Sequence, residues 1–149
     1  AVKFLFLFFL IWGNPNFNEP LDGIVYGVFV SLGFAWAENV IYVTHPILGG
    51  YETALERALL SVPGHGLFGV RMGYYFALGK YRNRKRYLPL SFFSPYLAHA
   101  LYNYFLLKRE PVFWLFFSVL EVRLWVFGLK RIKELQNCSP FREKVSKES

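Results

Sequence analysis

Long blocks of apolar residues, separated by short polar connections, are the feature that most constrains this chain. Four blocks, at residues 23–43, 55–78, 88–107 and 112–129, come close to the roughly 20 residues that a helix needs to cross a bilayer core. A further block opens the sequence at residues 1–12 and is about half that length. Because only helices and closed barrels satisfy their backbone in lipid, the pattern predicts an all-α, multi-pass transmembrane helix bundle. We expect about five helices, with the first one incomplete.

The composition supports a lipid bilayer as the surroundings of this chain. Hydrophobic residues make up 54% of the 149 positions and aromatic residues 21%, while the formal net charge is +7. Binding to nucleic acid would explain the charge but not the apolar blocks, so we expect no nucleic-acid partner. Cys138 is the single cysteine, which excludes a disulfide scaffold.

The distribution of basic residues predicts the orientation of the bundle. Lys and Arg gather in the connection at residues 80–87 and in the tail that follows residue 129, whereas the opposite connections, at residues 44–54 and 108–111, hold few. By the positive-inside rule, loop 80–87 and the C-terminal tail are cytoplasmic. A site for lipid headgroups or for nucleic acid is the alternative use of that loop. The sequence therefore predicts a membrane-embedded helical domain at residues 1–129 and a basic cytoplasmic tail at 130–149, in the cell membrane.

Ionisable residues inside the predicted spans are functional candidates because they are costly to place in lipid. At about 1.5 Å of rise per residue, Glu38, His65 and His99 lie roughly 8 to 15 Å below the extracytoplasmic face, and Asn103 lies one turn from His99. Three helices thus bring Glu, His, His and Asn to one layer. The alternative is structural: either His could simply bond a neighbouring helix.

Small residues share a helical face with these candidates. In the second block they recur at steps of three and four from Gly23 to Glu38, and in the third block from Ser61 through His65 to Gly73. In the fourth block His99 shares a face with Pro95 and Asn103. Small residues let membrane helices approach closely, so Glu38 and both histidines, His65 and His99, are expected to face helix contacts rather than lipid. For Arg71 and Glu121, which lie deeper, we expect a structural ion pair.

Two chemistries remain open for such a layer. Glu38, His65 and His99 could ligate a metal, in which case Zn²⁺ is the expected ion. Alternatively, a buried Glu38 could act as general base on water, with the His and Asn side chains stabilising the oxyanion. Either chemistry supports hydrolysis of a peptide bond near the extracytoplasmic face.

The chain resembles the PrsW family of intramembrane proteases, which are related to the type II CAAX prenyl proteases. The matching segments are Leu21–Gly27, Gly33–Val43, Pro63–Gly69 and His99–Asn103. The resemblance implies a membrane hydrolase whose catalytic positions are Glu38, His65, His99 and Asn103. It also implies a single-span membrane protein as the substrate, since similar proteins cut the extracytoplasmic part of a membrane-bound anti-sigma factor.

The family's first motif is a Glu pair followed two residues later by a basic residue. Lys3 fits the basic position, which would place the pair immediately before Ala1. We therefore expect an N-terminally truncated chain that lacks part of its catalytic apparatus.

Two other functions stay open at this stage. The first is a non-catalytic membrane scaffold, as in a γ-secretase subunit distantly similar to this superfamily. The second is a small transporter or proton relay, which would use the same intramembrane Glu and His residues.

Overall fold

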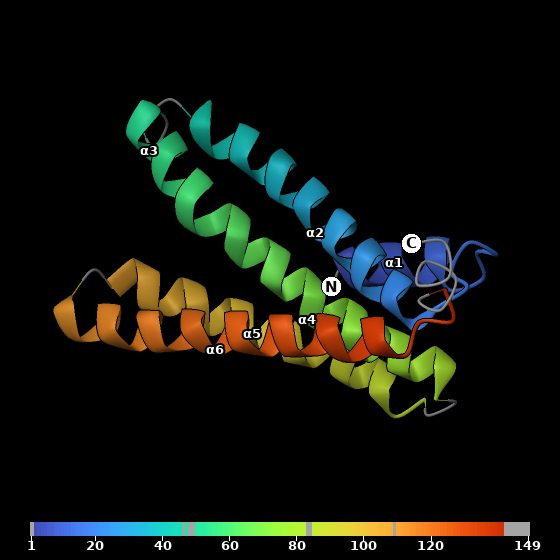
Figure 1. Cartoon of the computed structure of the whole chain (residues 1–149). Helices are drawn as coiled ribbons and strands as arrows, with labels where there is room; N and C mark the ends of the chain where they lie inside the picture. Colours follow the sequence, from blue (N-terminus) through green and yellow to red (C-terminus); the bar gives the residue numbers. More distant parts are fainter. Residues whose placement is uncertain (1, 46, 48–49, 83–84, 109, 142–149) are drawn as a thin grey trace, which may run out of the picture.

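The computed structural model describes residues 2–141 except 46, 48–49, 83–84 and 109, and the regular secondary structure of these residues is entirely helical. The elements, in chain order, are α1 (Val2–Ile11), α2 (Pro20–Val43), α3 (Tyr51–Glu56), the π-helical turn η1 (Arg57–Ser61), α4 (Val62–Tyr81), α5 (Tyr87–Lys108) and α6 (Pro111–Asn137). Since α3, η1 and α4 follow one another without a break, the chain forms five rods (Figure 1). The predicted all-α bundle is confirmed.

Helices α2 and α4 lie side by side along much of their length (Figure 1), and glycines allow their close approach. A Cβ on Gly73 would lie 2.0 Å from the carbonyl oxygen of Gly23, and a Cβ on Gly27 would lie 2.6 Å from that of Gly69. Real side chains cannot occupy such positions, so only glycine permits this spacing. The predicted stripes of small residues are therefore the α2–α4 contact, and they bring Glu38 on α2 next to His65 on α4.

A π-helical turn introduces α4. Pro63 has no N–H and its ring would clash with the carbonyl group four residues earlier, so an ordinary α-helical turn cannot be completed here. The wider turn Arg57–Ser61 precedes it. Such turns inside α-helices are frequent at functional sites. The Leu60 carbonyl oxygen accepts a 2.6 Å hydrogen bond from the hydroxyl of Tyr102 on α5, which ties the turn to the next helix.

Two apolar clusters hold the rods together. One lies where α1, the following connection and α6 meet α4, and it includes Leu7, Phe17, Phe76 and Leu135. The other joins α4, α5 and α6 around Phe68 and Tyr102. Helix α4 contributes to both clusters, and it is the most buried element of the bundle. Side chains on α4 are therefore held in place by neighbouring helices, as the residues of a functional site must be.

Two helices, α2 and α6, are long and apolar enough to cross a membrane by length and composition. Helices α4 and α5, of 20 and 22 residues, do not meet the same test. Many large apolar side chains point outward, among them Phe29 and Trp36 on α2 and Leu115 on α6. Outward-facing apolar side chains are what a lipid environment requires.

The helical part of the chain extends further than the sequence predicts. We expected a tail from residue 130, but α6 continues to Asn137. The reason is packing: Leu135 is 2% exposed and belongs to the same cluster as Leu7 and Phe17. The predicted tail residues 142–149 lie outside the described part of the chain.

Candidate active site

Glu38 and His65 meet across the α2–α4 contact. Nε2 of His65 lies 3.3 Å from Oε2 of Glu38. The His65 side chain is 5% exposed, whereas the Glu38 side chain is 40% exposed. The imidazole is therefore fixed within the bundle, and the carboxylate reaches it from a position that an incoming molecule could approach.

His99 on α5 completes the set from a third helix. Its ring lies edge-on to the His65 ring, with 5.2 Å between the ring centroids. Phe68, one turn after His65 on α4, packs against the His99 ring at 5.0 Å. The structure thus brings together the three ionisable residues that the sequence singles out. Asn103, one turn further along α5, is exposed.

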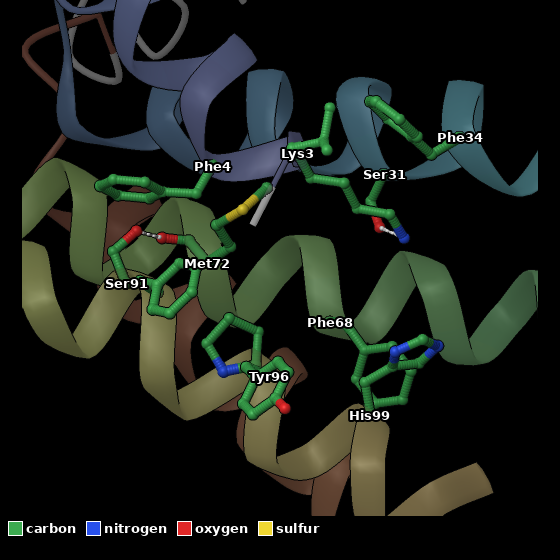
Figure 2. A pocket seen from close by; sticks show the side chains of 12 residues that line it. Lys3, Phe4, Ser31, Phe34, Phe68, Met72, Ser91, Tyr96 and His99 are labelled. Atoms are coloured by element: carbon green, nitrogen blue, oxygen red, sulfur yellow. Dashed lines mark hydrogen bonds between the residues drawn. The ribbon is translucent and has the colours of Figure 1, made fainter.

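Lys3 on α1 approaches His65 from the other side. Its Nζ lies 3.0 Å from Nδ1 of His65 and 3.5 Å from Oγ of Ser31, and the Ser31 hydroxyl donates a 2.7 Å hydrogen bond to the His65 carbonyl oxygen. Figure 2 shows the Lys3 side chain extending along Ser31. Since an ammonium group only donates, Nδ1 accepts, and the ring hydrogen sits on Nε2, facing Glu38. Lys3, His65 and Glu38 therefore form one continuous polar chain.

Arg57 is a member of this site that sequence reasoning missed. Its Nη2 donates to Oε2 of Glu38 at 3.0 Å, and its Nε donates to Oδ1 of Asn39 at 2.7 Å. The guanidinium also lies 4.0 Å from the centroid of the Tyr42 ring. The distribution of basic residues gave Arg57 no role in a site. The signal that could have revealed it is an Arg six residues before the motif proline, opposite a Glu-Asn pair.

The deeper charged residues do not form the expected ion pair. Arg71 donates from Nε to the Ser94 hydroxyl and lies 4.7 Å from the centroid of the Phe127 ring. Glu121 accepts a 3.2 Å hydrogen bond from the indole of Trp125. The sequence indicates the depth of Arg71 and Glu121 but not the direction in which each side chain points. In the structure Arg71 points to Ser94, and Glu121 pairs with Trp125 on its own helix.

The residues present fit a metal ion in their chemistry. Two His and one Glu are a familiar donor set for zinc. Two ligands of a tetrahedral zinc ion, each about 2.0–2.1 Å from the metal, are roughly 3.4 Å apart, which is close to the 3.3 Å between His65 and Glu38. In the described part of the chain, however, no group of three His, Cys, Asp or Glu side chains is arranged to hold a metal as it stands. A shared ion would need His99 to turn towards the other two.

Comparison with known proteins now identifies the family. Residues 1–128 match the model of the PrsW family intramembrane metalloproteases. Among similar curated proteins, the Protease PrsW of Geobacillus kaustophilus is 40% identical over 136 residues, covering 89% of this chain and 58% of the relative. The Protease PrsW of Halalkalibacterium halodurans is 41% identical, covering 88% and 60%. That of Bacillus subtilis is 37% identical, covering 92% and 62%.

This chain spans about three fifths of the length of these relatives. No solved structure matches it. The resemblance that rests on the segments around Glu38, His65 and His99 is confirmed by the match over most of the sequence. The chain therefore belongs to the PrsW family of intramembrane metalloproteases and is membrane-embedded, as that family is.

Proposed function

We propose that the protein is an intramembrane protease that hydrolyses a peptide bond of a membrane-anchored substrate near the extracytoplasmic face. The observation that carries this proposal is the meeting of Glu38, His65 and His99 from three helices. The first two side chains are 3.3 Å apart and the two imidazole rings 5.2 Å apart. Family membership supports the same activity.

Glu38 is the residue best placed to accept a proton from water. Its Oε2 is held by Arg57 and His65. Within the described residues, its Oε1 makes no hydrogen bond and is free to face a water molecule. In the proposed step, Glu38 takes a proton from water as the oxygen attacks the substrate carbonyl, and then delivers it to the leaving amine. His65 holds Glu38 in place through its Nε2–H, His99 stabilises the negative charge that develops on the carbonyl oxygen, and Asn103 orients His99 or that carbonyl group.

A metal-dependent version of this chemistry uses the same residues. Glu38, His65 and His99 would hold the ion, and Zn²⁺ is the ion that this donor set favours. When bound, zinc acidifies water and polarises a carbonyl group. To ligate through Nε2, His65 must carry its hydrogen on Nδ1, so Lys3 would have to release that nitrogen. The two versions therefore differ at Lys3. In the metal-free version it stays bonded to Nδ1 of His65, and in the metal-dependent version it moves away from that nitrogen.

The orientation and the substrate form part of the proposal. With loop 80–87 and the C-terminal tail in the cytoplasm, a multi-pass arrangement in the cell membrane places Glu38 towards the outer face. A substrate with a single span and an extracytoplasmic domain can present its peptide bond at that depth. Anti-sigma-factor-like membrane proteins are the substrate class to test first.

The test uses the full-length protein that contains this chain, co-expressed with a tagged single-span substrate. We expect cleavage by the unaltered protein and its loss in Glu38→Gln, His65→Ala and His99→Ala at unchanged protein levels. His45→Ala is the matched control, because this exposed His lies in the connection after α2. Full cleavage by the three site variants would overturn the proposal.

The same variants distinguish the two other functions. A scaffold predicts altered migration of a complex on native gels, with no accumulation of an uncleaved substrate. A proton relay predicts proton flux in proteoliposomes that the Glu38 variant abolishes.

A further inference from the structure

A cavity of about 340 Å³ lies beside the candidate active site, between α1 and α2 on one side and α5 on the other, with α4 as its floor (Figure 2). His99 and Lys3 line it towards the site, and Met72, Ser91 and Phe92 line its opposite part. Binding pockets for small molecules start at about 300 Å³, so this cavity is large enough for a substantial side chain. Of the residues to which catalysis is assigned, His99 lines it directly.

The lining of the cavity determines what it can bind. The hydroxyl of Ser31 donates to the His65 carbonyl oxygen at 2.7 Å, and the hydroxyl of Ser91 donates to the Met72 carbonyl oxygen at 2.8 Å. The Lys3 ammonium group is engaged by His65. These three polar groups are thus committed to the protein itself. The His99 ring and the Tyr96 hydroxyl are the other polar parts of the wall, and the rest of it is aromatic rings, a thioether and the aliphatic groups of Val2 and Pro95. An apolar group has no hydrogen bonds to water to give up when it enters the cavity, so it is the occupant that this wall favours.

The cavity opens to the surface of the bundle on its α5 side. Tyr96 on α5, which lines the cavity, is 60% exposed. In a membrane-embedded chain, a side opening of this kind faces lipid rather than water. A membrane-spanning segment can therefore reach it laterally, and a soluble peptide cannot.

We propose that this cavity is the subsite that receives a large apolar side chain of the substrate, adjacent to the bond that is cut. This inference rests on the proposed protease function and adds a substrate class to it: membrane segments that carry Leu, Phe or a similar residue next to the cleaved bond. Phe92 and Tyr96 determine the size limit, because Phe92 forms a wall and Tyr96 stacks on it with 6.1 Å between the ring centroids.

The first experiment measures kcat/KM of the full-length protein for single-span substrates that differ only beside the cleaved bond, with Ala, Leu, Phe, Trp or Asp. We expect Leu and Phe to be preferred over Ala and Asp by at least about tenfold, the usual discrimination of an apolar pocket. Phe92→Ala widens the pocket, so it should raise the Trp-to-Leu ratio about tenfold. Tyr96→Ala should raise the same ratio, since Tyr96 stacks on Phe92. Its matched control is Tyr104→Ala, which should leave the ratio unchanged: Tyr104 lies on the same helix at 50% exposure, away from the cavity.

The second experiment does not depend on cleavage. A photoreactive benzophenone side chain is placed at position 96 or 104 in the Glu38→Gln background, and cross-linking to the substrate span is measured. We expect a cross-link from position 96 and none from position 104. Two results together would overturn the subsite while leaving the protease function intact. Phe92→Ala would cleave with the same side-chain preference as the unaltered protein, and position 96 would give no cross-link. A cross-link at 96 without cleavage in any variant would support the subsite and count against the protease function.

Discussion

Nε2 of His65 and Oε2 of Glu38 lie 3.3 Å apart although the two residues belong to different helices. The same oxygen accepts a 3.0 Å hydrogen bond from Arg57, so the carboxylate is held from two sides. Arg57 comes from the π-helical turn that precedes Pro63. The π-helical turn thus directs the Arg57 guanidinium towards Glu38, where a regular helix would point it in another direction.

The first prediction concerns Arg57 as a positioning residue. Arg57→Gln should lower kcat about tenfold or more with little change in KM, because hydrogen bonds to charged groups contribute about 1.5–3 kcal/mol. Arg57→Lys keeps the charge and should recover part of the loss. Arg123→Gln, an exposed arginine on α6, is the control. Cleavage kinetics on the full-length protein decide the matter, and an Arg57→Gln enzyme with unchanged kcat would show that Glu38 needs no such support.

The second prediction concerns the α2–α4 contact. Gly73→Ala should destabilise the bundle by about 1–3 kcal/mol, because the new Cβ would lie 2.0 Å from the Gly23 carbonyl oxygen and the helices would have to separate. Gly33→Ala, on the partner helix α2, meets nothing within 4 Å and should be neutral or slightly stabilising. Thermal unfolding in detergent, followed by size-exclusion chromatography, measures both. Equal melting temperatures for the two variants would contradict the observed packing.

The third prediction concerns the bond between α5 and the π-helical turn. Tyr102 is 2% exposed, and its hydroxyl donates to the Leu60 carbonyl oxygen at 2.6 Å. Tyr102→Phe removes the donor and leaves that carbonyl group without it, so we expect a loss of about 1–3 kcal/mol in stability. Tyr104→Phe removes an exposed hydroxyl of the same helix and should have no effect. An unchanged melting temperature in Tyr102→Phe would mean that the turn does not depend on this bond.

Much of the bundle could be predicted from the sequence because hydropathy and small-residue spacing are local signals. The blocks at residues 23–43 and 88–107 correspond closely to α2 and α5, and the small stripes correctly gave the contact that joins Glu38 to His65. The length of α6 was underestimated because its last two turns are basic on the outside. Only tertiary packing of Leu135 shows that they remain helical.

Two contacts of the candidate site could not be predicted from the sequence, because one comes from an irregular turn and the other joins residues far apart in the chain. Arg57 reaches Glu38 from a π-helical turn, and hydropathy gives no indication of such a turn. Lys3 contacts His65 across 62 residues of chain, and no spacing rule relates two helices whose relative rotation is unknown. Arg71 was assigned the wrong partner for the same reason. The roles of Asn103 and of a metal ion stay predictions.

The central claim is that Glu38 and His65 act as one unit on a single water molecule. A double-mutant cycle measures this most directly, with kcat/KM for a single-span substrate determined for Glu38→Gln, His65→Ala and the double variant of the full-length protein. We expect each single change to reduce kcat/KM by about 10²–10⁴-fold, and the double variant to fall no further than the worse single one. Losses that multiply in the double variant, or singles that retain full activity, would contradict the claim.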